Sequence, residues 1–408
     1  MATEPPIGGR ARNRRARIAA ATLFLGNGAL FANLLPRYPE IKADLAMSNA
    51  AFGAAVAAFS AGALLAGMAA GALIRRFGSA RVAVATTMTL AAFIVLAGGL
   101  AATPLMFAAA LLLAGASDAV TDVAQNANGL RLQRLYRRSI INSLHAVWAV
   151  GAIIGGLMGA AAIALDIPRA WHLGIAAVVF CALVAVAYPS MLPGTDHDDR
   201  PPPERTPRPA SSGVHLVLLA LVGIAVAGAV VEDAGTSWAT LYLRDSLGAP
   251  GSLAALGYVA LVGFMFVGRL VGDRLVDRFG ERTVTRAGGL LAASGMGAAL
   301  AFPSVPGTIA GFAAAGLGVA TVVPAAMRAA DELPGLRAGS GLTVLTWLMR
   351  VGSLGAPLIV GVVADATSLR VGLLSVPVAG IALIVLAQVL GGRRRSGRAS
   401  EMPPAEGR

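Results

Sequence analysis

Apolar residues fall in twelve blocks along the chain, separated by short segments that carry most of the charged residues. Each block is roughly 20 residues long, which is the length that a helix needs to cross the hydrocarbon layer of a bilayer. We place the blocks at 18–36, 50–74, 82–102, 105–130, 140–165, 170–192, 214–242, 252–276, 285–302, 307–330, 339–364 and 371–391. The pattern predicts an all-α membrane protein with twelve transmembrane helices.

A polar, proline-rich stretch, PGTDHDDRPPPERTPRPASSG, divides the blocks six and six. Its composition is typical of a flexible linker between two bundles. We interpret its acidic run, Asp196 to Asp199, as a solvated part of the linker rather than a metal site. The predicted organisation is a basic tail at 1–17, a six-helix bundle at 18–192, the linker at 193–213, a second six-helix bundle at 214–391 and a tail at 392–408.

Composition agrees with this class. Only 13% of the residues are charged and the mean hydropathy is +0.72, whereas charged residues make up about a quarter of an ordinary soluble protein. The single cysteine, Cys181, excludes an intrachain disulfide and a cysteine metal cluster. The chain has no G-x-x-x-x-G-K-[ST] loop for ATP and no H-E-x-x-H metal motif. We therefore predict no enzyme activity, no cofactor and no metal.

The basic residues predict the orientation. The net charge is +12, and 27 of the 33 basic residues lie in the tails, the linker and the alternate loops that share one side of the predicted membrane. Because basic loops remain on the cytoplasmic side, both termini are expected there. This distribution accounts for the positive charge without a nucleic-acid partner.

The two halves of the chain repeat a loop. GALIRRFGSAR follows the second block, and GDRLVDRFGER follows the eighth, at an offset of 202 residues. Repetition at a fixed distance indicates two related structural units. The residues of interest in the two copies are Gly71, Arg75, Arg76, Gly78 and Arg81, then Gly272, Asp277, Arg278, Gly280 and Arg282.

The six-plus-six blocks, the linker and the two loops resemble the major facilitator superfamily of secondary transporters, whose loop signature is G-x-L-x-D-R-x-G-R-R. The resemblance implies the two-bundle fold of that family and a cytoplasmic gate in which these loops lock the bundles together. The match is incomplete, since Arg75 stands at the acidic position of the first copy and Gly272 falls one place early in the second. The first copy therefore lacks the carboxylate that the implied lock uses.

Three further stretches, ASDAVTDVAQNANG, SLHAVWAVGAIIGG and EDAGTSWATLYLRD, resemble a bacterial inner-membrane branch near the fucose:proton symporters. This finer resemblance implies a protein of the bacterial plasma membrane. The antiporter pattern of the fifth helix, glycine-x-x-x-glycine-proline, is not reproduced, because Gly156 stands where the proline would be. We expect a monomer.

Ionisable residues inside a span are functional candidates, because each costs roughly 2.5–3.5 kcal/mol on insertion scales. Asp118, Asp122 and Gln125 are spaced four and three apart and share one stripe of a helix. Two carboxylates one turn apart repel each other when both are ionised, so one would hold a proton near neutral pH. They suit a proton-coupling site; the alternative is a pair of hydrated charges near the end of the span.

Two other spans carry polar stripes. Asn142, His145 and Trp148 recur every three residues in the fifth span, where His145 is either a proton-exchanging group or a structural imidazole. Thr346, Trp347 and Arg350 lie in the eleventh. The Arg350 guanidinium needs either an anionic ligand or a carboxylate partner, for which the candidates are Asp118, Asp122, Glu232 and Asp233.

The remaining candidates lie in the seventh and first spans. Glu232 and Asp233 are adjacent, so at most one of them faces a central cavity comfortably, since neighbours on a helix point about 100° apart. Trp238 is predicted either to stack on a ligand ring or to anchor the span at the interface. Asn27, between Gly26 and Gly28, offers an amide for a sugar-like ligand or marks a packing notch.

These residues predict a secondary active transporter that moves a small polar, sugar-like or organic-acid solute by alternating access, coupled to protons. Proton-driven efflux of drugs or metabolites is the alternative, although a broad drug pump should present more aromatic residues than the 5% found here. A membrane receptor that binds without transporting is a lesser alternative. The expected partners are the solute, protons and the bilayer.

Overall fold

The computed structural model describes residues 7–136, 140–192, 213–333, 336 and 340–391, with side chains from residue 12 onward. These residues form helices and connecting turns, without strands among them. Residues 1–6 of the first predicted tail, residues 193–212 of the predicted linker with the acidic run at Asp196 to Asp199, and the second predicted tail at 392–408 lie outside the described residues.

The first bundle contains six long helices, in agreement with the apolar pattern. Its first helix begins at Ile7, inside the predicted tail at 1–17, because arginine is a good helix former and continues the helix beyond the apolar block. The elements are α1 (Ile7–Leu34), α2 (Tyr38–Asp44), α3 (Asn49–Phe77), α4 (Ser79–Val95), α5 (Pro104–Tyr136), α6 (Ile141–Ala164) and α7 (Arg169–Ala187).

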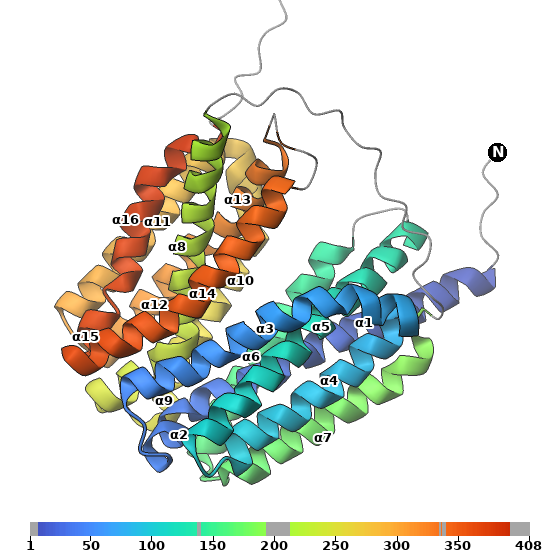
Figure 1. The fold of residues 1–408 in the computed structure, drawn as a ribbon, viewed down its shortest axis with the longest axis horizontal. Coiled ribbons are helices and arrows are strands. Elements are labelled where there is room, and N and C mark those ends of the chain that lie inside the picture. The colour runs from blue at the N-terminus through green and yellow to red at the C-terminus, as the bar shows by residue number, and fades with distance from the viewer. Residues whose placement is uncertain (1–6, 137–139, 193–212, 334–335, 337–339, 392–408) are drawn as a thin grey trace, which may run out of the picture.

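The second bundle divides three of its six predicted spans into two pieces each. Its elements are α8 (Val214–Leu241), α9 (Gly251–Ala254), α10 (Leu256–Phe279), α11 (Glu281–Ala301), α12 (Val305–Val319), α13 (Val322–Asp331), α14 (Ser340–Ala366), α15 (Leu369–Gly372) and α16 (Ser375–Leu386). In Figure 1 the blue-to-green helices and the green-to-red helices form two separate groups.

Eleven helical segments in the described part of the chain are long and apolar enough to cross a membrane. The ninth predicted span, α11, is not among these eleven segments, because Arg286 and several glycines lower its mean hydropathy. It nevertheless packs against α12 and α16 inside the second bundle. The described residues therefore form a fold of twelve membrane helices, as the sequence predicts.

The repeated loops have the same backbone geometry. Gly78 ends α3 and Gly280 ends α10, each with φ of 84°, which glycine adopts readily and other residues do not. Each donates its N–H to the carbonyl four residues earlier, Ile74 and Val276 respectively, at 2.8 Å. The offset of 202 residues therefore relates equivalent turns in two similarly built halves.

The two bundles meet at one end and separate toward the other (Figure 1). At the end where α2, α9 and α15 lie, Gly53 of α3 packs on the Pro357 carbonyl of α14, and Gly156 of α6 packs on the Tyr258 ring of α10. Toward the other end, Gly67 of α3 has no neighbour within 4 Å of its Cβ position. We call the first the closed end and the second, which contains Gly78 and Gly280, the open end.

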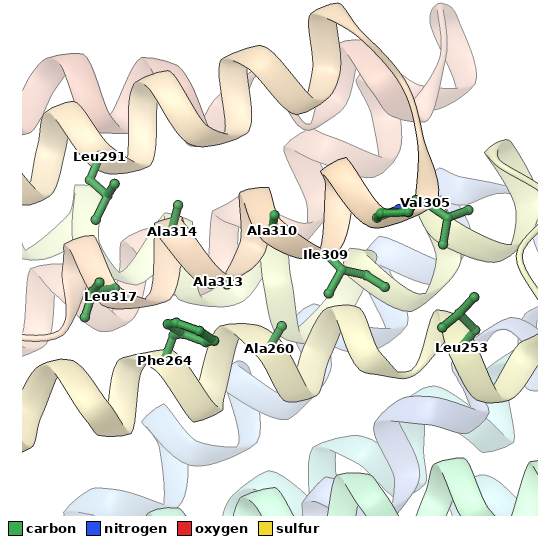
Figure 2. A pocket seen from close by; sticks show the side chains of 11 residues that line it. Leu253, Ala260, Phe264, Leu291, Val305, Ile309, Ala310, Ala313, Ala314 and Leu317 are labelled. Carbon is green, nitrogen blue, oxygen red and sulfur yellow. The ribbon is translucent and has the colours of Figure 1, made fainter.

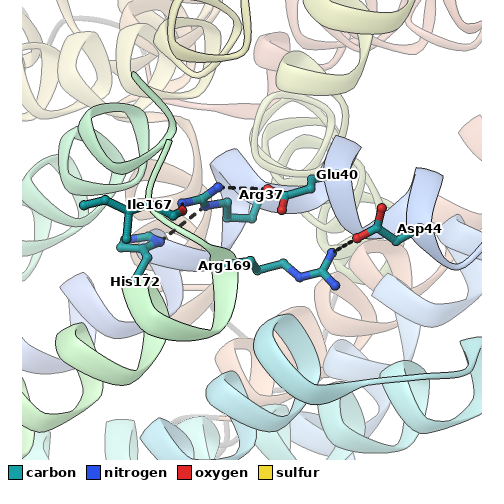
Figure 3. A network of polar contacts seen from close by, with 6 residues as sticks. All are labelled: Arg37, Glu40, Asp44, Ile167, Arg169 and His172. Carbon is teal, nitrogen blue, oxygen red and sulfur yellow. Dashed lines mark hydrogen bonds and ion pairs between the residues drawn. The ribbon is translucent and has the colours of Figure 1, made fainter. Parts of the chain in front are cut away.

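A buried polar network fixes the closed end of the first bundle (Figure 3). Arg37, only 4% exposed, donates to Glu40 at 2.9 Å, to the Ile167 carbonyl at 2.7 Å and to His172 Nδ1 at 3.4 Å. Because arginine can only donate, Nδ1 must accept, so His172 is neutral with its proton on Nε2. That Nε2–H donates to Asn33 at 2.9 Å, which joins α1 to α7.

Helix packing within the first bundle depends on glycine. A Cβ on Gly62 of α3 would overlap the Leu112 carbonyl oxygen, and a Cβ on Gly115 of α5 would overlap the Phe59 carbonyl oxygen. The backbones of the two helices therefore touch at both positions. Small residues allow such close approach between membrane helices, where lipid offers no hydrophobic driving force for association.

Gly115→Ala should lower the thermal unfolding temperature in detergent, because the added methyl group pushes α5 away from backbone atoms that cannot move aside. Overpacking of this kind costs about 1–3 kcal/mol. The control is Gly174→Ala in α7, where a Cβ meets nothing within 4 Å, so the helix should tolerate it or gain stability. Equal unfolding temperatures for both variants would contradict this packing.

His172→Phe should also lower the unfolding temperature, because it leaves Arg37 Nε and Asn33 Oδ1 without these hydrogen bonds inside the bundle. An unsatisfied buried polar group costs about 1–3 kcal/mol. Arg169→Gln is the matched control, since it breaks the nearby 2.7 Å pair with Asp44, whose side chain is 54% exposed. Exposed pairs contribute about 0–1 kcal/mol, so a control as unstable as His172→Phe would refute the assignment.

Candidate functional site

Three helices of the first bundle bring a tryptophan, an asparagine and an aspartate into one hydrogen-bonded chain. Trp148 of α6 donates its indole N–H to Asn27 Oδ1 at 3.0 Å, and Asn27 Nδ2 donates to Asp118 Oδ1 on α5 at 3.2 Å. The close approach of α1 and α6 requires Gly28, whose Cβ would overlap the Trp148 carbonyl oxygen. The indole thus fixes the orientation of the Asn27 amide toward Asp118.

A second polar group lies one helical turn farther along α5. Asp122 Oδ1 accepts from Gln125 Nε2 at 3.4 Å and from Asn126 Nδ2 at 3.0 Å. Asn126 Oδ1 then faces His145 Nε2 of α6 at 3.0 Å, so this ring nitrogen is the donor. The structure therefore connects the exposed imidazole to Asp122 through one amide.

Asn126 and Ser353 were missed in the sequence, although each follows a predicted residue at helical spacing. Asn126 lies four positions after Asp122, and Ser353 lies three after Arg350. Both positions fall on the stripe of the earlier residue. Only the packing of the helices shows that Asn126 joins two predicted candidates and that Ser353 meets Asp233.

Arg350 of α14 approaches this region from the second bundle. It and Asp122 are the charged groups that act on Asp118. Among the described residues the Arg350 guanidinium forms no hydrogen bond and no ion pair within 4.0 Å. On the same helix, Thr346 donates to the Leu342 carbonyl and Trp347 is 42% exposed. Arg350 thus acts electrostatically on a carboxylate without bonding to it in the described part of the chain.

Glu232 and Asp233 of α8 face different neighbours, as their spacing predicts. Asp233 lies within hydrogen-bonding reach of Ser353 on α14, and its Oδ2 has no partner. Glu232 is close enough to Tyr258 of α10 to act on it electrostatically. Asp233 therefore bonds toward α14, while Glu232 acts electrostatically on α10.

Two predicted ligand residues lie elsewhere. Trp238 is fully buried at the closed end, edge-on to Phe52 with 5.4 Å between ring centroids, and so has no access to a solute in this conformation. In this conformation Trp238 is open neither to a ligand nor to the membrane interface. It packs between the two bundles. Asn142 is exposed near the start of α6, toward the open end, and forms no contact with the Asn27–Asp118 pair.

The predicted gate residues lie at the open end, and each contacts only its own bundle. Arg76 lies over the Phe77 ring at 5.2 Å and Arg278 over the Phe279 ring at 5.3 Å, again at an offset of 202. Arg282 donates to the Leu390 carbonyl at 3.1 Å. In the part of the chain that the structure describes, Gly71, Arg75, Arg81, Gly272 and Asp277 also make no bond to the opposite bundle. The described residues of the two loops therefore do not form the contacts between bundles that the resemblance implies.

An apolar depression of about 660 Å³ lies between α10, α11 and α12 (Figure 2). All of its lining residues are nonpolar, among them Phe264, Leu317 and Ile309. None of the polar groups described above lines it, and its chemistry suits lipid chains. Among the described residues no group of histidine, cysteine and carboxylate side chains could hold a metal ion.

Comparison with known proteins agrees with this architecture. The sequence profile of the Major Facilitator Superfamily matches residues 19–276 and 234–405. The chain is 32% identical to an uncharacterized transporter, y4wD, of Sinorhizobium fredii over 90% of this chain and 96% of the relative. It is 28% identical to the membrane protein MosC of Rhizobium meliloti over 96% of this chain and 95% of the relative.

Solved structures share the fold at low sequence identity. A bacterial homolog of the human lysosomal transporter Spinster, in an inward-facing and unoccupied conformation, has a TM-score of 0.71 at 13% identity and covers 93% of this chain and 98% of its own. The nucleoside transporter NupG has 0.69 at 11%, covering 91% and 97%. A D-xylose-proton symporter has 0.65 at 15%, covering 92% and 96%.

The fold and these relatives define a multi-pass membrane transporter of the secondary type and not an enzyme. The chain belongs to the major facilitator superfamily. The finer placement near the fucose:proton symporters stays a prediction.

Arg350→Gln should leave the unfolding temperature unchanged or slightly raised, because the guanidinium has no bonded partner to lose and its desolvation is relieved. Removing one partner of a buried ion pair would instead destabilise the protein by about 3–5 kcal/mol. A thermal unfolding assay in detergent, with His172→Phe as the destabilised reference, separates these outcomes. A loss as large as that of the reference would establish Arg350 as a structural ion-pair residue.

Proposed function

We propose that the protein is a proton-coupled symporter for a small polar solute and that Asp118 carries the coupling proton. The supporting observation is the Trp148–Asn27–Asp118 chain, which places a positioned carboxylate on α5 within the electrostatic reach of Arg350 from the other bundle. A carboxylate at membrane depth is stabilised by a proton or by a nearby cation. Asp118 therefore has two exclusive ways to be neutralised.

The choice between a proton and Arg350 as the group that neutralises Asp118 supplies a mechanism of coupling. Ionised Asp118 attracts Arg350 and draws α5 and α14 together, whereas protonated Asp118 does not. Binding and release of the proton thereby change the attraction between the bundles at 18–192 and 214–391, which we take as the two moving units. In transporters of this type, such bundles rock about a site near the middle of the membrane. Asp122, Asn126 and His145 provide a hydrogen-bonded route toward the open end.

The groups available to a solute are an amide, an indole, carboxylates and a guanidinium. They suit a hydroxyl-rich or organic-acid compound better than a bulky apolar one, because Trp238 is withdrawn into the closed end. The nucleoside transporter and the D-xylose-proton symporter of the same fold support a polar solute. Asn27, Gln125, Thr346 and Arg350 are the residues we assign to its recognition.

The open end is the cytoplasmic end in this proposal. It contains Arg76 and Arg278 in the repeated loops, whereas the closed end has few basic residues, among them Arg37 and Arg169. Basic residues mark the cytoplasmic side. The structure then represents an inward-facing state in the bacterial plasma membrane, with both termini cytoplasmic and the gate loops apart.

Asp118→Asn should abolish proton-driven accumulation while leaving solute exchange across the membrane intact, because asparagine keeps the hydrogen bonding but cannot ionise. Purified protein in liposomes that contain a pH-sensitive dye is challenged with D-xylose, uridine, organic acids, amino compounds and cationic drugs. A solute that moves protons in the unmodified protein is then tested for accumulation and for exchange in the variant.

Asp122→Asn is the matched comparison, since it makes the same change one turn away on α5. It should slow accumulation without abolishing it. Loss of exchange together with accumulation in Asp118→Asn would assign Asp118 to binding or folding. Proton flux that survives in Asp118→Asn would refute the coupling role, and solute-driven flux of opposite sign would favour efflux.

A further inference from the structure

Beyond this proposed function, we propose that Asp365 is a latch that holds the closed end shut and so sets the balance between the two orientations of the carrier. Asp365 lies in the last turn of α14, in the second bundle. Its Oδ1 accepts the Asn49 backbone N–H and its Oδ2 accepts the Ala50 backbone N–H, both at 2.8 Å. Asn49 and Ala50 begin α3, in the first bundle. One side chain therefore bonds the two bundles together.

Asp365 also caps the amino terminus of α3, whose first two backbone N–H groups it accepts. The first N–H groups of a helix have no partner within the helix. At α3, the Ser48 hydroxyl accepts the third of them, from Ala51, at 3.1 Å. Asp365 accepts the first two. A negative charge at this position is further stabilised by the dipole of α3.

The two hydrogen bonds of Asp365 can form only while α3 and α14 are packed against each other. A Cβ on Gly361, one turn before Asp365, would overlap the Asn49 carbonyl oxygen, and a Cβ on Gly53 would overlap the Pro357 carbonyl oxygen. The backbones of α3 and α14 thus touch in the two helical turns next to the latch. Opening of the closed end must separate them and break both hydrogen bonds of Asp365.

The internal repeat shows that packing alone does not require this carboxylate. At the offset of 202 residues, Asp365 corresponds to Ile163 at the end of α6, and Asn49 corresponds to Gly251 at the start of α9. These equivalents also meet, since a Cβ on Gly251 would lie 2.9 Å from Ile163 Cγ2. The same junction is therefore built once with isoleucine and once with aspartate. The carboxylate is an addition to one of two equivalent interfaces.

The test measures exposure of the closed end directly. Cys181→Ser removes the single cysteine, and Ala57→Cys introduces a thiol one turn after Gly53 on α3, at a position that is 6% exposed. In this background, Asp365→Asn and Asp365→Ile should increase the rate of labelling by a membrane-impermeant maleimide several-fold. Asparagine loses one acceptor, and isoleucine reproduces the junction of the repeat without any acceptor.

Asp365→Glu tests the chemistry of the latch, since it keeps the carboxylate and should label more slowly than Asp365→Ile. Asp331→Asn, an exposed aspartate at the end of α13, should label at the parent rate. Size-exclusion profiles identify any variant that fails to fold, in which case the Asn and Glu variants carry the comparison. Equal labelling of the parent, Asp365→Asn and Asp365→Ile would overturn the latch, as would equally fast labelling of all three Asp365 variants.

This experiment needs neither a solute nor a proton gradient. It rests only on movement of the two bundles, so its failure is distinguishable from failure of the proton-coupling role of Asp118. Unchanged labelling of the Asp365 variants, together with intact proton coupling, would show that other contacts set the resting orientation of the carrier.

Discussion

The free-energy cost of placing polar groups at membrane depth determines how the polar side chains of this protein are arranged. Water is absent there, so each amide, imidazole or charge must find a partner within the protein. The first bundle satisfies this demand with two hydrogen-bonded chains, one through Asn27 to Asp118 and one through Asn126 to Asp122. Arg350 has no bonded partner among the described residues, and it lies where the bundles face each other. Arg350 is therefore a charged group that is free to respond to a proton or a solute.

Glycine makes these chains possible by letting helix backbones touch. Gly28 brings α1 against α6 so that the Trp148 indole reaches Asn27, and Gly115 brings α5 against α3. Such close approaches hold helices together within the first bundle, while Gly53 and Gly361 place backbone contacts between α3 and α14 at the closed end. Separation of the bundles toward the open end is compatible with the rocking motion of alternating access.

The two halves are similar in backbone and different in chemistry. Gly78 and Gly280 adopt the same φ, and the arginine beside each stacks over the neighbouring phenylalanine in the same way. The carboxylates of α5 have no equivalent stripe in the second bundle, and Asp365 has isoleucine as its counterpart. The repeat accounts for the backbone that the two halves share, and the unshared side chains are the ones to which we assign the coupling and latch roles.

Much of the fold follows from the sequence by itself. The apolar blocks have the length of a membrane-spanning helix, which satisfies its backbone hydrogen bonds within the segment, so twelve helices in two groups could be predicted. Helical spacing likewise placed Asp118, Asp122 and Gln125 on one stripe. Only the tertiary structure decided which stripes meet. It paired Asn27 with Asp118, withdrew Trp238 into the closed end and set Asp365 against the start of α3, because contacts between helices distant in the chain depend on backbone approach and register, which local patterns do not encode.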